Sequence, residues 1–297
     1  MAIEFVPITP VIGAHVSGVS LAAITPAQFD ELYGVWQQHH VLLLRDQQLT
    51  NAQFERFSAM LGELDPPPNQ GAGRKSVADH PNLYVVSNRK NGAGEPIGAL
   101  GDGEAQWHTD MSYLPQPPFA SMLWSIELPD AGGDTCFASM PAALHSMPAD
   151  LVRRLERLSI KHDGTYDSGG FVRKGMTAND DPTQSVGTLH PIVIKQPETG
   201  ERTLYLGRRR NAYIPGVTLT ESEALLNAIW GYATDPQVTL RHQWQLGDVV
   251  LWNNFTTMHR RDGFPPDQFR TLHRSQIKGR YAPAAAAATA EPAREAA

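Results

Sequence analysis

The sequence of 297 residues contains a single cysteine, Cys136, so no disulfide can form within the chain. A metal site built from several thiolates, as in zinc fingers, is excluded for the same reason. The sequence also lacks a run of about 18 apolar residues, which a membrane-spanning helix needs. Its start, MAIEFVPITP, has neither the basic residues nor the apolar stretch of a signal peptide. We therefore expect a cytoplasmic protein that has no membrane partner.

Positive charge is also scarce, because 25 Lys and Arg face 31 Asp and Glu, for a net charge of −6. This balance argues against nucleic acid as a partner, since binding to phosphates needs a basic face. With 41% hydrophobic residues and six tryptophans, the chain can bury a sizeable core. We expect one domain over residues 1–281. Residues 282–297 are rich in Ala and have no amphipathic face, so we expect a disordered tail.

The pattern of apolar residues predicts helices over 26–40 and 51–64, with a short strand over 41–46 between them. Residues 66–106 resemble a long loop that is interrupted by one strand, 83–87. The rest alternates short strands with turn signals and two helices. The strands are expected at 120–128, 188–194, 203–206, 248–252 and 272–277, and the helices near 148–158 and 220–233. Such a chain is typical of a β-rich architecture, for example a jelly roll.

The motif WHTD places His108 and Asp110 two residues apart, so on a strand both side chains point to one face. A second histidine, His259, lies far along the chain. Two histidines and one carboxylate on one side of a metal leave its other side open, as non-haem iron(II) oxygenases require. The chain has eleven histidines, so spacing alone does not distinguish such a site from ordinary surface or core histidines.

The stretch MHRRDGFPPDQFRTLHRSQIKG at 258–279 is more specific when taken with WHTD and with GGDTCF at 132–137. Together these segments resemble the TauD/TfdA family of 2-oxoglutarate-dependent dioxygenases, over roughly residues 5–280. The resemblance implies that His108, Asp110 and His259 hold an iron(II) ion and that O₂ is a further substrate.

The same resemblance implies a binding site for the cosubstrate 2-oxoglutarate. Arg270, eleven residues after His259, matches the family arginine that binds its distal carboxylate, and Thr135 matches the threonine that contacts the same group. The pairing makes chemical sense, because a guanidinium offers a planar fork of donors and a hydroxyl can satisfy a further lone pair.

The substrate contacts are less defined. Arg274 lies on the same strand face as Arg270, and we expect it to bind an anionic group of the substrate; pairing with a neighbouring acid is the alternative. The run Arg208–Arg210 is either a solvated loop or a further attraction for an anion. Glu104 stands where taurine dioxygenase has an amide, so taurine itself is not expected.

Four further residues near the motifs receive conventional roles. Trp107 and Trp252 flank the ligands, and we expect them to pack around the metal pocket and exclude water. His273 lies on the face opposite Arg270, so it is expected to be a core or surface histidine. His190 is given no role.

The fold that the resemblance implies is a β-rich α+β structure with a double-stranded β-helix core, similar to the cupins, and flanking helices. The expected activity is hydroxylation of a small organic anion, namely a sulfonate, aryloxyalkanoate, alkyl sulfate or related carboxylate. It is coupled to decarboxylation of 2-oxoglutarate to succinate, and the hydroxylated product is expected to fragment. A homo-oligomer, dimer or tetramer, is also implied. The alternatives are a non-catalytic cupin-like metal-binding protein, a zinc hydrolase, and a dioxygenase that acts on an amine or amino acid.

Overall fold

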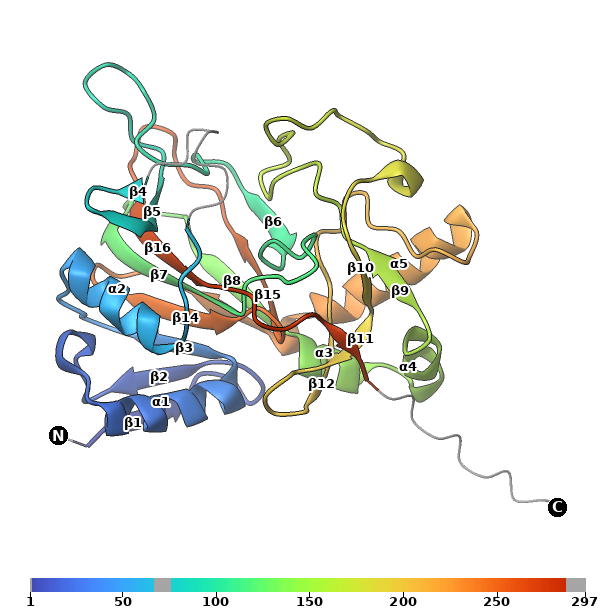
Figure 1. Cartoon of the computed structure of the whole chain (residues 1–297), viewed down its shortest axis with the longest axis horizontal. Helices are drawn as coiled ribbons and strands as arrows, with labels where there is room; N and C mark the ends of the chain where they lie inside the picture. Colours follow the sequence, from blue (N-terminus) through green and yellow to red (C-terminus); the bar gives the residue numbers. More distant parts are fainter. Residues whose placement is uncertain (1, 67–75, 287–297) are drawn as a thin grey trace.

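The computed structural model describes residues 2–66 and 76–286, and it is mixed α/β, rich in strands with few helices (Figure 1). Among the described residues there are five α-helices: α1 (Pro26–His39), α2 (Asn51–Met60), α3 (Met140–Ser146), α4 (Ala149–Leu155) and α5 (Leu219–Ala233). None of them combines the length and the apolar character needed to cross a membrane.

Two sheets carry the candidate site. The larger has eight strands, in the order β1 (Glu4–Pro7), β2 (Ala14–Ser17), β3 (Val41–Leu44), β14 (Val249–Asn253), β7 (Ala120–Glu127), β16 (Thr271–Ile277), β5 (His80–Ser87) and β4 (Ser76–Val77). The smaller has four, in the order β13 (Thr239–His242), β8 (Thr135–Ser139), β15 (Thr257–Arg261) and β6 (Ala105–His108).

Strands β3 and β14 of the larger sheet are buried on both faces, which explains why their sequences are almost entirely apolar. In β3, Leu42 and Leu44 pack on the side of α1 and α2, while Val41 and Leu43 face the opposite way. The second group shares a core cluster with Phe137 of β8 and with residues of β5, β13, β14 and β16. The two sheets therefore enclose an interior, and α1 and α2 cover the outside of the larger one (Figure 1).

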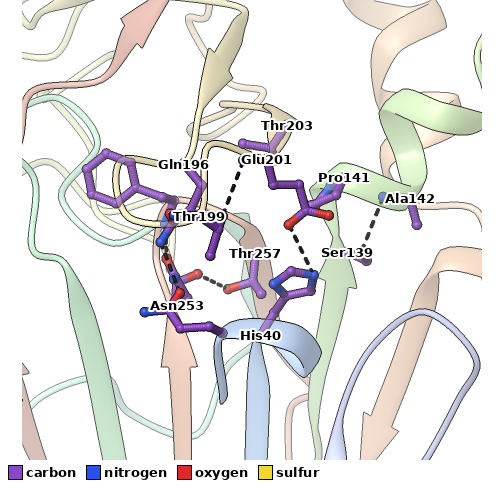
Figure 2. A network of polar contacts seen from close by, with 12 residues as sticks. His40, Ser139, Pro141, Ala142, Gln196, Thr199, Glu201, Thr203, Asn253 and Thr257 are labelled. Atoms are coloured by element: carbon purple, nitrogen blue, oxygen red, sulfur yellow. Dashed lines mark hydrogen bonds and ion pairs between the residues drawn. The ribbon is translucent and has the colours of Figure 1, made fainter. Parts of the chain in front are cut away.

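The N-terminal helices begin where the sequence predicts and end earlier. Thr25 and Thr50 each form a complete capping box at the start of α1 and α2. Helix α1 ends at His39 because His40 adopts a left-handed backbone with φ of 64°. The His40 Nε2 atom lies 3.8 Å from the Glu201 carboxylate, a contact that is visible in Figure 2.

A tight turn connects β14 to β15 and sets where His259 lies. The Thr257 hydroxyl donates to the Asn253 carbonyl at 2.8 Å, as Figure 2 shows, and the Phe255 amide donates to the Asn253 side chain at 2.9 Å. The turn is short, because strand β15 (Thr257–Arg261) already begins at Thr257. His259 is thus the central residue of β15, between β6 and β8.

A third group of elements packs around α3, α4 and α5. It includes the pair β9 (Ser159–Lys161) and β10 (Leu189–Pro191) and the small sheet β12 (Arg202–Leu204), β11 (Val193–Lys195) and β17 (Ala284–Ala285). Their apolar side chains form a separate core cluster. Helix α3, which the apolar pattern does not predict, starts at a capping Ser139 and is short.

The expected boundary of the C-terminal tail needs correction. Ala284 and Ala285 pair with β11, the Ala286 amide donates to the Val193 carbonyl at 3.1 Å, and Ala286 is buried. Small side chains let this segment lie flat against β11, although it has no amphipathic pattern. The remainder of the tail, 287–297, lies outside the described residues, as does part of the predicted loop, 67–75. That the chain forms one domain stays a prediction.

Candidate metal centre and its two cavities

Neighbouring strands bring the two predicted histidines together. His108 at the end of β6 is paired directly with His259 of β15, and Asp110 follows in the turn after β6. The Asp110 Oδ1 atom lies 3.8 Å from His108 Nε2 and 3.9 Å from His259 Nε2. One ligand atom from each of the three residues lies within 4.8 Å of the others. The three residues therefore present their donor atoms to one point.

Both imidazoles are held in a form that suits a metal. His108 Nδ1 is 2.7 Å from the Gln106 carbonyl, so Nδ1 carries the proton and Nε2 keeps its lone pair. The His259 ring lies 4.8 Å from the Trp252 ring and stacks on Phe137. Burial lowers the pKa of His259 to about 4 and holds the pKa of His108 well below its ordinary value, so both rings are neutral at pH 7.

The Asp110 carboxylate is held by its other oxygen. The Ser121 hydroxyl donates to Oδ2 at 2.8 Å, and the Arg274 guanidinium forms an ion pair with the same atom. Burial would raise the pKa of Asp110, but Arg274 and the two histidines outweigh it and keep the pKa below its usual range. Ser121 in turn accepts from Asn254 at 3.1 Å. Oδ1 is therefore left to face the histidines.

This donor set fits a divalent transition metal. Two neutral imidazoles and one carboxylate are the ligands that ferrous iron uses in oxygenases, and the three ligand atoms lie within 4.8 Å of one another. Ligand atoms about 2.1 Å from one ion and at right angles lie about 3 Å apart. The two Asp110 spacings of 3.8 and 3.9 Å would have to close by about 0.9 Å around a bound ion.

A cavity of about 450 Å³ opens on the histidine side of this centre. Arg270 and Thr135 line it together with His108 and His259. Arg270 is only 2% exposed, and within the described part of the chain its Nε and Nη2 atoms have no hydrogen-bond partner. Burial and the nearby Arg261 lower its pKa. Such a buried guanidinium is costly unless an anion occupies the cavity.

The GGDT motif shapes this cavity. The Thr135 hydroxyl accepts from Trp244 Nε1 at 3.0 Å, so its own hydrogen remains for another acceptor. Gly133 has φ of +70°, and a Cβ there would lie 3.0 Å from Arg270 Cδ and 3.1 Å from its Nε. Glycine at position 133 therefore leaves the room that the Arg270 side chain occupies.

A second cavity of about 460 Å³ lies on the Asp110 side of the centre. Three arginines line it, namely Arg173, Arg208 and Arg274, and its wall also includes Tyr84 and Tyr113. Both cavities share His108 and Arg274, so they meet at the predicted metal position. Arg274 is thus close to the centre, but its partner is Asp110, the alternative that the sequence left open. A substrate contact for Arg274 stays a prediction.

The tryptophans and the remaining histidines take different places. Trp252 lines the cavity that contains Arg270 and Thr135, as expected, whereas Trp107 faces away and packs against the cluster around α3 and α5. His273 points to the outer face of the large sheet, where its Nδ1 lies 2.8 Å from the Asn51 side chain. His190 contacts the Leu114 carbonyl at 2.9 Å.

Several charged residues that the sequence analysis named lie outside both cavities. Glu104 is exposed and lines neither cavity. Arg209 pairs with Glu223, and Arg210 lies 3.2 Å from the Asp180 carboxylate, so both point away from the centre. Sequence reasoning missed Ser121 and Arg173, because neither lies in a recognisable motif.

Comparison with known proteins agrees with this arrangement. The profile of the taurine catabolism dioxygenase TauD, TfdA family matches residues 4–276. The (S)-phenoxypropionate/alpha-ketoglutarate-dioxygenase of Sphingobium herbicidovorans is 31% identical, over 94% of this chain and 96% of the relative. The alkylsulfatase of Acinetobacter baylyi is 30% identical, over 90% and 82%. A crystal structure of a taurine dioxygenase from Burkholderia xenovorans superposes with a TM-score of 0.77 at 31% identity, covering 94% and 90%. The chain therefore belongs to the taurine catabolism dioxygenase TauD, TfdA family.

Proposed function

We propose that this protein is an iron(II)- and 2-oxoglutarate-dependent dioxygenase that hydroxylates a small organic anion. The observation that carries the proposal is the buried Arg270 guanidinium, whose unpartnered nitrogens line a cavity that opens on the His–Asp–His group. A protein that only stored a metal would have no need for this charge. The family supports the same activity.

In this proposal His108, Asp110 and His259 hold the iron, and Arg270 with Thr135 binds the distal carboxylate of 2-oxoglutarate. When bound, the iron supplies O₂ activation and the oxidative decarboxylation of 2-oxoglutarate to succinate and CO₂, which together oxidise a substrate C–H bond. The chain orients the reactants and excludes water. Trp252 and the other apolar residues of the cosubstrate cavity serve that exclusion.

The substrate class follows from the relatives and from the second cavity. The named relatives act on a phenoxypropionate, on alkyl sulfates and on taurine, which carry a carboxylate, a sulfate and a sulfonate. Three arginines line the second cavity, and the single carboxylate there, Asp110, is already paired. An anionic substrate suits that charge balance. Where the hydroxylated carbon bears oxygen or sulfur, the product would fragment into a carbonyl compound and a leaving group.

Several broader features belong to the same proposal. The two facing sheets around a metal centre support a double-stranded β-helix core of the jelly-roll type, with α1 and α2 outside. We also propose a single catalytic domain that extends at least to Ala286, a cytoplasmic location and a homo-oligomer, dimer or tetramer. Nucleic acid and membranes are not proposed as partners.

The main alternatives lose support from the site. An amine or amino acid substrate was suggested by Glu104, but that side chain is exposed and outside both cavities. A zinc hydrolase would use the same three ligands. Its chemistry would not need Arg270 and Thr135, which line the cavity beside them.

The direct test measures succinate. Protein supplied with Fe(II), ascorbate and 2-oxoglutarate should form succinate faster when (S)-2-phenoxypropionate, hexyl sulfate or another organic anion is added. Product formation that needs no 2-oxoglutarate, or that persists with Zn(II) in place of iron, would contradict the proposal. A His259→Ala protein, which should fail to retain iron, provides the negative control.

A further inference from the structure

Trp244 contacts both residues that we assign to the distal carboxylate of 2-oxoglutarate. It lies in the turn between β13 and β14 and packs against the core cluster that includes Trp252. Its Nε1 atom donates to the Thr135 hydroxyl at 3.0 Å, and the Arg270 guanidinium lies over its ring, with Cζ 5.5 Å from the centroid. Trp244 is not among the residues that line the cavity, so it stands behind the proposed cosubstrate site.

The hydrogen bond from Trp244 decides how the Thr135 hydroxyl can be used. An indole N–H can only donate, whereas a hydroxyl has one hydrogen and two lone pairs. The contact therefore uses a lone pair of the Thr135 oxygen, and the hydroxyl hydrogen points elsewhere. Because Thr135 lines the cavity, its hydrogen is available to an acceptor there. Trp244 thus sets Thr135 as a donor, which is what a carboxylate requires.

The face of the indole has a separate effect on Arg270. This guanidinium is buried, and its Nε and Nη2 atoms have no hydrogen-bond partner in the described part of the chain. An aromatic ring within about 6 Å attracts a guanidinium through its π electrons and takes up none of its N–H groups. A carboxylate in the same place would occupy those groups. Trp244 therefore stabilises the charge of Arg270 and leaves its donors for a ligand.

The turn that carries Trp244 is fixed by contacts on both sides of this residue. The Gln245 amide donates to the Asp248 carboxylate at 2.7 Å, and the Ser125 hydroxyl donates to the Gln245 carbonyl at 2.6 Å. On the other side, the His242 ring meets the Trp244 ring edge to face, at a centroid distance of 4.6 Å. Asp248 and His242 are both buried. The fold therefore fixes where the indole lies before any ligand binds.

We propose that Trp244 is a positioning residue for the cosubstrate. Its N–H orients the Thr135 hydroxyl, and its ring supports the Arg270 guanidinium, so that both groups meet the distal carboxylate of a dicarboxylic 2-oxo acid. Trp244 acts through these two residues and makes no contact with the ligand itself. The inference rests on the proposed function, which assigns Thr135 and Arg270 to 2-oxoglutarate.

The experiment measures binding of 2-oxoglutarate to the full chain loaded with Mn(II), by calorimetry. Trp244→Phe keeps a ring and removes the N–H, so it should weaken 2-oxoglutarate by about three- to tenfold, the effect of one neutral hydrogen bond. Trp244→Leu removes the ring as well and should weaken it by about tenfold or more. The affinity for Mn(II) alone should stay within about twofold of wild type in both variants, because neither Thr135 nor Arg270 is a proposed metal ligand.

A double-mutant cycle separates positioning from a general structural role. In a Thr135→Val protein the hydroxyl that Trp244 orients is gone, so Trp244→Phe should then change the 2-oxoglutarate affinity by less than about twofold. A structural defect would weaken binding by the same factor in both backgrounds. Trp230→Phe is the matched control, because the Trp230 indole nitrogen has no hydrogen-bond partner in the described part of the chain. Its 2-oxoglutarate affinity should equal that of wild type.

The inference is wrong if Trp244→Phe binds 2-oxoglutarate as tightly as wild type, or if it weakens binding equally with and without the Thr135 hydroxyl. A loss of Mn(II) affinity that matches the loss of 2-oxoglutarate affinity would also contradict it, because the whole site would then be disturbed. If Trp244→Leu binds no more weakly than Trp244→Phe, the role assigned to the ring is wrong. If wild type itself binds no 2-oxoglutarate, the proposed function fails, and the inference that rests on it fails with it.

Discussion

Arg270 offers the sharpest test of the cosubstrate site, because the same substitution should have opposite effects on the empty and the loaded protein. The side chain is 2% exposed, and its Nε and Nη2 atoms lack partners in the described structure. Replacing it with Met keeps the approximate volume and removes a buried charge. The unliganded Arg270→Met protein should therefore unfold at the same temperature as wild type or at a higher one.

The effect on 2-oxoglutarate should be large. Removing the partner of a buried charge pair costs about 2 to 5 kcal/mol, which corresponds to about thirty-fold to several thousand-fold in the dissociation constant. At a 2-oxoglutarate concentration of about 100 times the wild-type Kd, wild type gains about 2.7 kcal/mol of stability. In a protein of this length that is about 5 °C in Tm, at roughly 2 °C per kcal/mol.

A thirty-fold weaker site gains only about 0.9 kcal/mol at the same concentration, so the shift should fall below about 2 °C. The assay is thermal unfolding of the Mn(II)-loaded protein with and without 2-oxoglutarate. Arg241→Met is the matched control, because Arg241 pairs with Asp134 and Asp262 beside the same motif but is half exposed. An Arg270→Met protein that loses several degrees when unliganded and keeps the full shift would show that Arg270 is structural.

Other predictions concern the metal centre and acid stability. His259→Ala should lose iron on gel filtration, and an iron content equal to wild type would remove this residue from the ligand set. Ser121→Ala should weaken metal binding about 10- to 100-fold by releasing Asp110 Oδ2, whereas Ser125→Ala on the same strand, which bonds the Gln245 carbonyl, should not change metal titrations. Burial lowers the pKa of His40 to about 4, so the unfolded chain takes up its proton first as pH falls from about 6.5 toward 4. In urea unfolding, wild type should lose about 2.5 kcal/mol more stability than His40→Gln between pH 7 and pH 4.5, because His40 alone contributes about that much; equal losses would contradict this origin.

Strand periodicity explains which parts of the site could be predicted from sequence. Positions two or four apart share a face, which correctly grouped Arg270 with Arg274 and placed His273 on the other side. The same rule indicates that Trp107, one residue from His108, faces away from the metal centre, as it does in the structure. The predicted strands coincide with observed ones, whereas β8, β13 and β15 were not predicted.

Contacts that depend on sheet order could not be predicted in this way. Ser121 and Arg274 both contact Asp110, because β7 and β16 are paired strands and Asp110 lies in the turn after β6. The local sequence pattern does not specify that these strands are neighbours. Contacts between distant segments likewise distinguish the three arginines at 208–210. Arg209 pairs with Glu223 and Arg210 pairs with Asp180, whereas Arg208 lines the second cavity. Three consecutive arginines look alike in sequence but not in the folded chain.

The direct pairing of His108 with His259 also bears on how this scaffold can change over evolutionary time. The two proposed ligands lie on hydrogen-bonded neighbouring strands, so their spacing depends on strand register and not on the length of chain between them. Insertions and deletions in the connections that line the second cavity, such as the one between β9 and β10, would leave the metal ligands in place. A single added residue inside β6 or β15 would turn a ligand to the wrong face. Substrate choice can thus diversify by changes in loop length while the oxidative chemistry is inherited intact.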